Sequence, residues 1–577
     1  LEANSIDGWL RAPVIGHSQV GYHPAQRKVA VIELDANDDE AREATLLSIG
    51  ADGRREVAAR GVPAEWGRYK RYDYRHFDFS DVRDEGVYVL TYGDVESGPF
   101  RIAKNVYADI WQPTLDVFFP VQMDHMLVNE AYRVWHGASH LDDALQAPVD
   151  HEHFDLYAQG PTTDTPFEPG EHIPGLNVGG WYDAGDYDIR TQTQYYVVNN
   201  LVNVWENFGV ERDVTLVDYA RKSVDIHVPD GENDLLQQIR HGTLALVAQY
   251  RAVGHAIPGI VEAHLAQYTH LGDGITKTDN LVYDPSLTEL ETDGTRSGLF
   301  DDRWAFTSRS SALNFGSMAA LAAASRALEG FDDELAEEAL AIAVGAWDEE
   351  QALDEPYTFR HGNTTGGPLA AEEMKAALEL LVATGERQYR ERFLEFLPEL
   401  EQNFGQHAIL AVRALPHLDA EYGRTVRRLA GDYGKTLDGF AESNPYGVLI
   451  TEGGWAGNGA VIGIAMTNWY LHQAFPELID PEHVYAGLNY LFGTHPHSNL
   501  SFVSAVGARS KQVAYGMNRA DFSFIAGGIV PGVLILKPDY PENKEDWPFL
   551  WGENEYVISL GASYLFLARA AADLLAE

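Results

Sequence analysis

Two acidic residues stand three positions apart in a glycine-rich stretch of the sequence. Residues 179–190 read GGWYDAGDYDIR, and the first two acids are Asp183 and Asp186. Glycine permits backbone conformations that other residues avoid, and carboxylates held in such a loop can take or orient a proton. The aromatic residues beside them, whose flat faces suit a sugar ring, are Trp181, Tyr182 and Tyr187. The alternative is an Asp-rich turn or a helix N-cap, because Asp186 stands just before a predicted helix.

A second group of acids among aromatic residues lies near the C-terminus. Residues 547–555 read WPFLWGENE and directly precede the last predicted helix. A glutamate between Trp551 and Tyr556 would be desolvated, which raises the pKa of its carboxyl group and suits a general acid. The alternative is that Glu553 or Glu555 complements the N-terminal dipole of that helix.

Hydrolysis of a glycosidic bond needs one ionised carboxylate and one protonated carboxyl group. The first activates a water molecule, and the second protonates the leaving oxygen. Two aspartates three residues apart can divide the first task, because one takes the proton while the other holds the water. Spacing alone leaves open whether the two groups meet in space. The sequence carries no cofactor motif, so we expect a reaction that requires no cofactor.

The elements that must position these acids fall into two parts. Short alternating segments separated by turn residues run to about residue 103 and predict a β-sandwich with a structural role. The predicted strands are 14–22, 28–34, 44–49, 76–82, 87–92 and 99–102. We therefore expect a small β domain over residues 1–104 and a catalytic domain over residues 105–577.

After residue 107 the apolar residues recur with helical period to the end of the chain. Helices are predicted near 107–128, 188–208, 214–226, 234–253, 308–328, 334–349, 370–384, 387–396, 406–415, 421–440, 459–474, 482–491 and 556–575. No strands are expected between them. Such a mainly α domain is a closed ring of helix pairs or a solenoid, and the absence of a fixed sequence repeat counts against the solenoid.

The composition limits the partners of the protein. The chain has 42 Lys and Arg residues against 87 Asp and Glu residues, a net charge of −45, which repels nucleic acid and anionic membranes. We attribute this charge to a salt-tolerant source or to solubility rather than to substrate steering. The longest apolar runs are too short to span a membrane.

The compartment is left open by the sequence. Cysteine is absent, which excludes disulfides and thiolate metal sites without fixing the compartment. No basic and apolar leader follows Leu1, which slightly favours the cytoplasm over secretion with a signal already removed. The sequence gives no indication of the oligomeric state.

Several motifs together resemble glycoside hydrolase family 9. They are GGWYDAGDYD at 179–188, Asn554-Glu555 before the closing helix and GHSQVGYHPAQRKVAVI near the N-terminus. Further landmarks, in the same order, are FRIAKNVYADI at the domain junction, VWHGASHLDDA at 134–144, the segment 301–328 and LNYLFGTHPHSNLSFVS at 488–504. The resemblance covers nearly the whole chain. It implies an (α/α)6 barrel preceded by an immunoglobulin-like β-sandwich, and an oligosaccharide as substrate.

The resemblance also implies roles for the acids. Asp186 matches the general base, Asp183 the residue that helps position the water, and Glu555 the general acid. The family inverts the anomeric centre, so acid and base should stand roughly 6.5 to 9.5 Å apart to admit a water molecule. We expect no catalytic metal. Some relatives hold structural calcium in oxygen-lined loops, and calcium stays open here although no EF-hand-like spacing appears.

The sequence departs from the cellulases of the family after the FGTHP segment. His495 replaces the Asn of their FGTNP-like segment, and the following GARSKQVAYGMNRADFSF lacks the His-His-Arg signature that grips glucose hydroxyls. The altered region resembles a divergent branch of exo-β-D-glucosaminidases that act on chitosan oligosaccharides. Within the stretch from His136 to Asp143, Asp143 together with Asp142 is predicted to bind the sugar amine by a charge-assisted hydrogen bond. The alternative for these two aspartates is a salt bridge or a helix cap.

Aromatic residues elsewhere are candidates for stacking on sugars, although in a helical barrel an aromatic side chain is more often part of the core. The candidates are Trp135, Tyr187, Trp304, Trp455, Tyr490 and Trp551. His151 and His153 alternate in an acidic loop and offer nitrogen ligands, but a solvated pair is expected there.

The leading prediction is an inverting, exo-acting hydrolase that removes β-1,4-linked D-glucosamine from the ends of chitosan oligosaccharides. The alternative within the class is an endo-β-1,4-glucanase on cellulose or a mixed-linkage glucan. An inactive carbohydrate-binding protein is the alternative from another class. Such a protein is expected to have lost one of the acids, whereas Asp183, Asp186 and Glu555 are all present.

Overall fold

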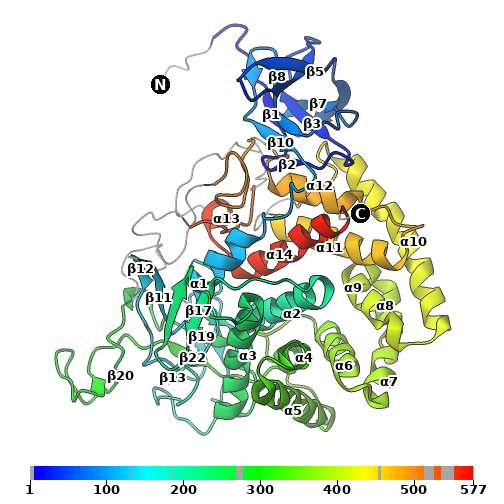
Figure 1. Cartoon of the computed structure of the whole chain (residues 1–577). Helices are drawn as coiled ribbons and strands as arrows, with labels where there is room; N and C mark the ends of the chain where they lie inside the picture. The colour runs from blue at the N-terminus through cyan, green and yellow to red at the C-terminus, as the bar shows by residue number, and fades with distance from the viewer. Residues whose placement is uncertain are drawn as a thin grey trace.

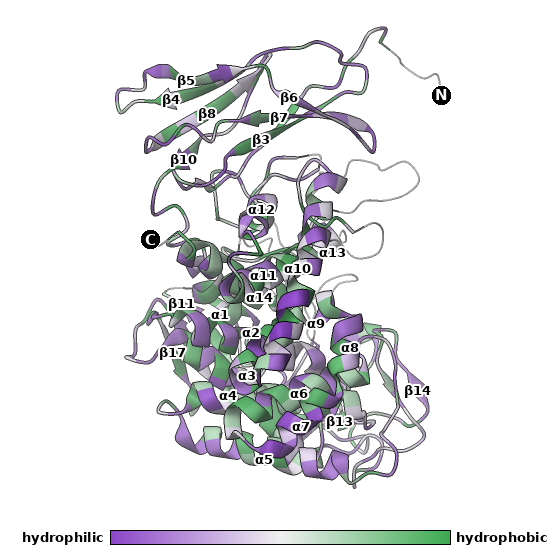
Figure 2. Ribbon diagram, turned by 90° about the vertical axis from the view of Figure 1, so that its right-hand side faces the viewer, coloured by the Kyte–Doolittle hydropathy of each residue, from purple (hydrophilic) through white to green (hydrophobic). Residues whose placement is uncertain are grey.

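An N-terminal β-sandwich sits on a larger helical domain (Figure 1). The computed structural model describes residues 6–131, 133–185, 188–267, 277–451, 457–496, 498–511, 525–533 and 551–575. Figure 2 shows the sandwich stacked on one end of the helical domain, with most of its strands above α12.

The sandwich consists of two sheets. One sheet has the strand order β1 (Val14–Gly16), β3 (Val29–Leu34), β7 (Tyr72–Asp78) and β6 (Ala64–Tyr69). The other has the order β2 (Gly21–Tyr22), β10 (Phe100–Ile102), β8 (Gly86–Tyr92), β4 (Ala44–Ile49) and β5 (Arg55–Gly61), with β9 (Val95–Glu96) paired to β8. Alternate residues of these strands, among them Leu46, Leu90 and Phe100, are buried between the sheets, as a half-buried strand requires.

Each predicted strand segment of this domain overlaps an observed strand. Strands β5 and β6 were not predicted, because their sequences REVAARG and AEWGRY show no apolar alternation. Most residues of β5 are exposed, so this edge strand is held by its pairing with β4 rather than by a buried face.

Six helices of the second domain form a closed ring in which each packs against the next. They are α2 (Thr191–Phe208), α4 (Ser311–Leu328), α6 (Leu369–Thr384), α9 (Phe404–Ala414), α11 (Asn458–Ala474) and α14 (Ile558–Asp573), and α14 closes the ring on α2. Helix α4 is alanine-rich and buried on nearly all sides, which is typical of a helix enclosed by others.

A second layer of helices surrounds this ring. Helix α3 (Asp234–Val253) packs on α2 and α4, α5 (Asp333–Gln351) on α4, α7 (Arg387–Glu395) on α6, α8 (Leu397–Gln402) and α10 (Ala420–Ser443) on α9, and α12 (Glu482–Leu491) on α11. A π-helical turn (Thr114–Phe118) contacts α14 and leads into the short α1 (Phe119–Gln122). The last short helix, α13 (Trp551–Asn554), precedes α14. The closed ring of helix pairs, not the solenoid, is the arrangement adopted.

The helical domain also contains strands, contrary to the prediction. They are β11 (Leu127–Glu130), β12 (Arg133–His136), β13 (Leu145–Gln146), β14 (His151–Glu152), β15 (Ala158–Gln159), β16 (Ile189–Arg190), β17 (Thr215–Asp218), β18 (Ser223–Ile226), β19 (Gly259–Val261), β20 (Val282–Tyr283), β21 (Arg296–Ser297) and β22 (Trp304–Phe306). The predicted helix at 214–226 is wrong, because this segment is the β17–β18 hairpin. The predicted helix at 107–128 is reduced to the π-helical turn and α1, and its last residues begin β11. In β18 burial alternates with period two, the signature of a strand.

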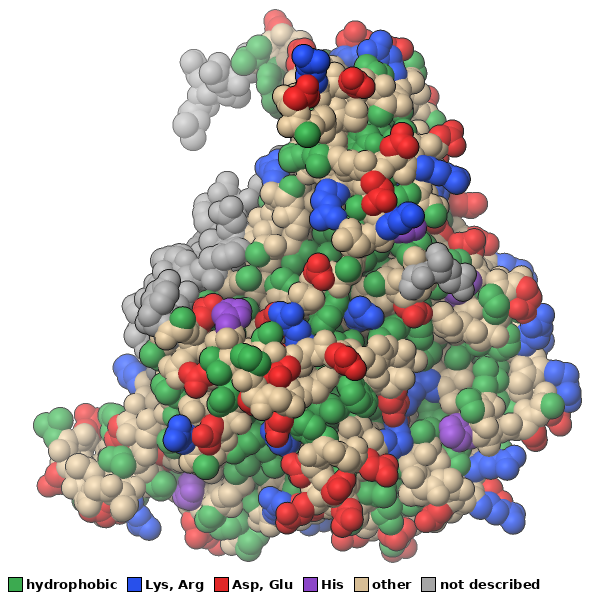
Figure 3. All heavy atoms as spheres, in the orientation of Figure 1, with side chains coloured by type: hydrophobic (Ala, Val, Ile, Leu, Met, Phe, Trp, Pro, Cys, Tyr) green, Lys and Arg blue, Asp and Glu red, His purple; other side chains and the backbone are tan. Residues whose placement is uncertain are grey.

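The two domains are joined by buried polar contacts. The Gln19 N–H donates to the Phe492 carbonyl at 2.7 Å, and the Tyr74 hydroxyl donates to Glu33 at 2.9 Å beside Tyr446 of the helical domain. Among the described residues no helix is long and apolar enough to cross a membrane. Acidic side chains are scattered among basic ones over the face in Figure 3 rather than gathered in one patch.

Candidate active site

The loop that carries Asp183 is held tightly before α2. The Asp183 N–H donates to the Asp188 carbonyl at 3.0 Å. Gly179 has a φ of 66°, and a Cβ there would lie 2.5 Å from the His241 carbonyl oxygen. Only glycine fits this position. Strand β16 then pairs with β19 and leads directly into α2.

The structure brings Asp183 and Glu555 into one site. The Gly185 N–H donates to Oε1 of Glu555 at 3.1 Å, and the Ile558 N–H donates to the Asp183 carbonyl at 3.1 Å. Residues 370 positions apart in the sequence are therefore joined by a direct hydrogen bond between loop and carboxylate. The N-cap of α2 is Arg190, not Asp186, and it makes no side-chain capping bond.

Both carboxyl groups are buried, with 8% of each residue exposed. Burial raises the pKa of Asp183 to about 7, although Arg190 opposes the rise; its Nη1 lies 3.2 Å from Oδ2 of Asp183. Burial also raises the pKa of Glu555 well above its usual value, and the nearby charge of Asp183 adds to the effect. A glutamic acid that holds its proton at neutral pH can serve as a general acid.

Sequence reasoning missed several polar residues that surround this pair. The Tyr157 hydroxyl donates to Asp188, whose Oδ2 also accepts from Arg190 at 3.0 Å. Burial raises the pKa of Asp155 to about 8, and the charge of Asp188 adds to the rise. Oδ2 of Asp155 is buried without a hydrogen-bond partner. Asp155 stands in the segment HFDLY, where an acid among aromatic residues was a usable signal.

The predicted amine-binding residue Asp143 faces a guanidinium group. Asp143 and Arg303 are both fully buried, and Nε of Arg303 donates to Oδ2 of Asp143 at 2.9 Å while its Nη2 donates to Asp124 at 2.9 Å. Despite burial, Arg303 holds the pKa of Asp143 well below its usual value. This geometry favours the salt-bridge alternative over recognition of a sugar amine.

Asp142 and His136, two other residues of the stretch from His136 to Asp143, lie in different surroundings. Asp142 is 1% exposed and accepts a hydrogen bond from the Thr278 hydroxyl at 3.2 Å. His136 is partly exposed, and its ring meets that of Tyr182 edge-on at 6.4 Å. His136 therefore lies beside Tyr182 of the Asp183 loop, as does Ser139 of the same stretch, whose hydroxyl is 3.2 Å from that of Tyr182.

The predicted stacking residues divide into three groups. Trp135 and Tyr490 are buried, at 8% and 3% exposed, which favours the core role for both. Trp304 is partly exposed and packs edge-on against His151 at 4.9 Å. Asp186, Tyr187 and Trp455 lie outside the described residues, as does the side chain of Trp551, and their roles stay predictions.

Two histidines that the sequence singled out are buried. His153 was expected to be solvated but is buried, with its Nε2 2.6 Å from the Glu262 carbonyl oxygen. His495 is also buried and stacks on Phe502 at 4.0 Å. The substitution that sets this chain apart from the family's cellulases is therefore accommodated in the core. Residues 512–524 of the segment after it lie outside the described residues.

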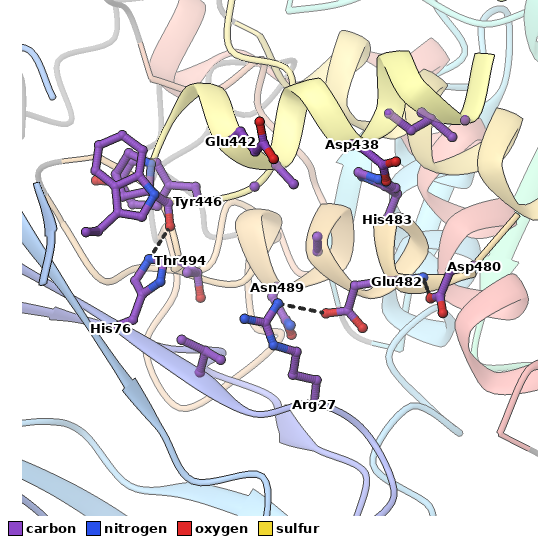
Figure 4. Close-up of a pocket in the computed structure, with 18 of the residues that line it drawn as sticks. Arg27, His76, Asp438, Glu442, Tyr446, Asp480, Glu482, His483, Asn489 and Thr494 are labelled. Atoms are coloured by element: carbon purple, nitrogen blue, oxygen red, sulfur yellow. Dashed lines mark hydrogen bonds and ion pairs between the residues drawn. The ribbon is translucent and has the colours of Figure 1, made fainter. Parts of the chain in front are cut away.

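A cavity of about 1130 Å³ lies elsewhere, between the sandwich and helices α10 and α12. In Figure 4 Arg27 points toward Glu482 at 3.9 Å, and His76 contacts the Pro445 carbonyl at 2.8 Å. None of the predicted site residues that the structure describes lines it. It is a cleft between the domains, whereas the buried carboxyl groups of Asp183 and Glu555 converge elsewhere.

Comparison with known proteins identifies the family. Residues 107–521 match glycosyl hydrolase family 9, and residues 11–97 match the cellulase N-terminal ig-like domain. The chain belongs to glycosyl hydrolase family 9. It is a glycoside hydrolase with an immunoglobulin-like domain before its catalytic domain.

Family 9 relatives share the architecture. Endoglucanase D of Acetivibrio thermocellus is 23% identical over 85% of this chain and 73% of its own length. A metagenome-derived family 9 endoglucanase of known structure has a TM-score of 0.74 at 21% identity and covers 97% of this chain and 99% of its own. AaCel9A in complex with cellobiose-like isofagomine has a TM-score of 0.69 at 19% identity, with coverage of 97% and 100%. The family's (α/α)6 barrel is thus the fold of the helical domain.

Proposed function

We propose that this family 9 hydrolase cleaves β-1,4-linked glycans with inversion of the anomeric centre. The observation that carries the proposal is the hydrogen bond from the Gly185 N–H to Glu555, which joins the loop of Asp183 to a glutamic acid of raised pKa. Inverting hydrolysis requires two carboxyl groups, one ionised and one protonated.

In the proposed mechanism Glu555 gives its proton to the glycosidic oxygen as the bond to the anomeric carbon breaks. Asp186, assigned from the family motif, takes a proton from the water that attacks the opposite face of the sugar. Asp183 holds that water, and its own carboxylate is anchored by Arg190 at 3.2 Å and by the Thr193 hydroxyl at 3.3 Å. The products are the released alcohol and a sugar of inverted configuration.

The first candidate for the substrate is a β-1,4-glucan cleaved in an endo manner. Its support is the function of the relatives, which include Endoglucanase D of Acetivibrio thermocellus and Endoglucanase C of Cellulomonas fimi. These relatives favour the glucanase over the glucosaminidase.

The second candidate is an exo-β-D-glucosaminidase acting on chitosan oligosaccharides. It is supported by the excess of acid around the site, because the charges of Asp155 and Asp188 act on Glu555 and that of Asp188 acts on Asp183, where Arg190 opposes it. A cationic sugar amine would be attracted by such an excess. The missing His-His-Arg signature points the same way.

The deciding experiment compares hydrolysis of cello-oligosaccharides with hydrolysis of chitosan oligosaccharides, while NMR follows the configuration of the new reducing end. Preference for cello-oligosaccharides with internal cleavage supports the glucanase. Preference for chitosan oligosaccharides with release of single glucosamine units supports the glucosaminidase. On either substrate a first-formed β-anomer would refute inversion.

A further inference from the structure

The loop between β14 and β15 turns one acidic side chain toward the protein. The loop is closed by the His153 N–H, which donates to the Tyr157 carbonyl at 2.9 Å. Within it Phe154 and Leu156 are 48% and 51% exposed, whereas Asp155 is only partly exposed and its Oδ2 is buried. The Asp155 carboxyl group therefore points inward, although its two neighbours point to solvent.

The C-terminal end of this loop is joined to the proposed catalytic pair by a chain of polar contacts. The Tyr157 hydroxyl donates to Oδ2 of Asp188, which also accepts from Arg190 at 3.0 Å. Nη1 of Arg190 lies 3.2 Å from Oδ2 of Asp183. The inward face of the loop, and with it Asp155, is therefore part of the active site.

The N-terminal end of the loop is fixed by a histidine that carries no charge. The Asp155 N–H donates to Nδ1 of His153 at 3.1 Å, so the ring proton is on Nε2, which donates to the Glu262 carbonyl at 2.6 Å. Burial lowers the pKa of His153 to about 4. The ring is therefore neutral at neutral pH and supplies no counter-charge for Asp155.

The loop is held in a strained conformation. Leu156 has a φ of 60°, which residues other than glycine rarely adopt. Its carbonyl accepts from the Thr364 hydroxyl at 3.4 Å, and a Cβ at Gly362 would lie 2.6 Å from the same carbonyl oxygen. Strain of this kind persists where the surrounding structure imposes it, and it is concentrated at functional sites. The loop is thus positioned before any ligand binds.

The Asp155 carboxyl group lacks a counter-charge of its own. Arg190 pairs with Asp183 and Asp188, and among the described residues no ion pair is formed with Asp155 and no hydrogen bond with its Oδ2. A buried carboxyl oxygen without a partner is costly. Asp155 also lies close enough to Glu555 for its charge to raise the pKa of that acid. A cationic group bound at the active site would supply the missing charge.

We propose that Asp155 determines the specificity of the site by binding the ammonium group of a glucosamine unit, an inference that rests on the glucosaminidase candidate of the proposed function. An ammonium group and a carboxylate form a charge-assisted hydrogen bond, which is stronger than one to a neutral hydroxyl group. The χ2 torsion of aspartate is broad, so either oxygen can turn toward the ligand. Asp155 thus replaces Asp143, which is paired with Arg303, in the predicted recognition of the amine.

The first test compares kcat/KM of the parent protein and Asp155→Asn on chitosan oligosaccharides and on cello-oligosaccharides, with a chelator present to remove metal ions. On chitosan oligosaccharides the variant is expected to lose about 10- to 100-fold, because a hydrogen bond between charged groups is lost. On cello-oligosaccharides the change should stay within about threefold. Asp150→Asn, at an exposed aspartate just before β14, is the matched control and should behave like the parent protein on both.

The second test needs no turnover. Calorimetric titration measures the Kd of glucosamine, of glucose and of N-acetylglucosamine, whose nitrogen carries no charge. The parent protein is expected to bind glucosamine about 10-fold or more tightly than the other two sugars, and Asp155→Asn should remove this preference. Asp155→Ser is a second variant in case the first does not fold.

The two tests separate a failure of this inference from a failure of the proposed function. If the parent protein hydrolyses cello-oligosaccharides with inversion but binds glucosamine no more tightly than glucose, the role of Asp155 is overturned and the inverting hydrolysis stands. Equal losses on both substrate series, or a preference for glucosamine that both variants keep, also overturn it. If neither substrate is hydrolysed, the proposed function fails, and the titrations alone decide whether Asp155 binds the amine.

Discussion

At the scale of single residues, the proposed reaction depends on where Glu555 keeps its proton. The residue is 8% exposed, and its carboxyl group accepts a hydrogen bond from the Gly185 N–H. That bond stabilises the ionised form, but burial and the charge of Asp183 act in the other direction and prevail. The net effect favours the protonated acid that a leaving oxygen needs.

Glu555→Gln is expected to lower kcat by about 10² to 10⁴-fold on natural glycans. The loss should be much smaller on aryl glycosides, because a good leaving group departs without a proton. Steady-state kinetics on both substrate types measures this. Glu553→Gln, the neighbouring buried acid, is the control and should keep most activity. Equal losses on both substrate types would argue against a general acid.

The buried acids also predict a pH dependence of stability. Burial raises the pKa of Asp155 to about 8, so the folded protein holds this proton more tightly than the unfolded chain. The free energy of unfolding should therefore fall as pH rises from about 5 to about 9. Asp155→Asn should flatten part of this decline in Tm, while the exposed Asp94→Asn should not. A Tm that rises over this range would contradict the sign.

At the scale of elements, Arg303, which directly precedes β22, connects three segments of the catalytic domain. Its guanidinium group binds Asp124 before β11 and Asp143 before β13, and it lies 5.6 Å from the centre of the Tyr182 ring. All three charged residues are fully buried. A buried ion pair of this kind is costly to break from one side, because the remaining charge has no partner.

Arg303→Met is expected to lower the free energy of unfolding by about 3–5 kcal/mol, since two buried carboxylates lose their counter-charge. Urea denaturation measures the change. Arg54→Met, at an exposed arginine of the sandwich, should change stability by less than about 0.5 kcal/mol. A similar small effect at Arg303 would mean that the cluster is protonated or solvated.

Asp143→Ala distinguishes structural support from substrate recognition. Since the Asp143 carboxylate is paired with the Arg303 guanidinium group, we expect comparable losses of kcat/KM on glucosides and glucosaminides, together with a lower Tm. Parallel assays on both oligosaccharide series check this. A loss confined to glucosaminides would restore the amine-binding role.

At the scale of the whole molecule, the net charge of −45 is distributed over both domains. Like charges on a compact surface repel one another and oppose folding. Acidic side chains lie near basic ones on the face in Figure 3, but acids are in excess. The repulsion acts over distances that salt can screen.

Raising NaCl from about 0.1 M to about 1 M should therefore increase the Tm, because the Debye length shortens from about 10 Å to about 3 Å. Calorimetry with a chelator present separates this effect from binding of divalent cations. The same increase in KCl is the control for a specific sodium effect. A Tm that falls with salt would show that attractive ion pairs outweigh the repulsion.

Local patterns in the sequence were sufficient for most elements. Short alternating segments separated by turn residues predicted β3, β4 and β8, and helical periodicity predicted α3 with its bounds unchanged. The glycines and acids of residues 179–190 indicated a catalytic loop, and the family motif supplied the role of Glu555. These features depend on residues close in the chain, whose propensities and spacing are visible without a fold.

Only the tertiary structure decided which distant groups meet. In the β17–β18 hairpin, β18 also pairs with β11, a partner that no local pattern reveals. The sequence alone did not show that the Asp143 carboxylate forms an ion pair with Arg303, 160 positions later. The bond between Gly185 and Glu555 likewise exists because α14 closes the ring on α2. Charge pairing and desolvation depend on distance in space. The sequence therefore identified the candidate acids, whereas packing determined their pKa values and their partners.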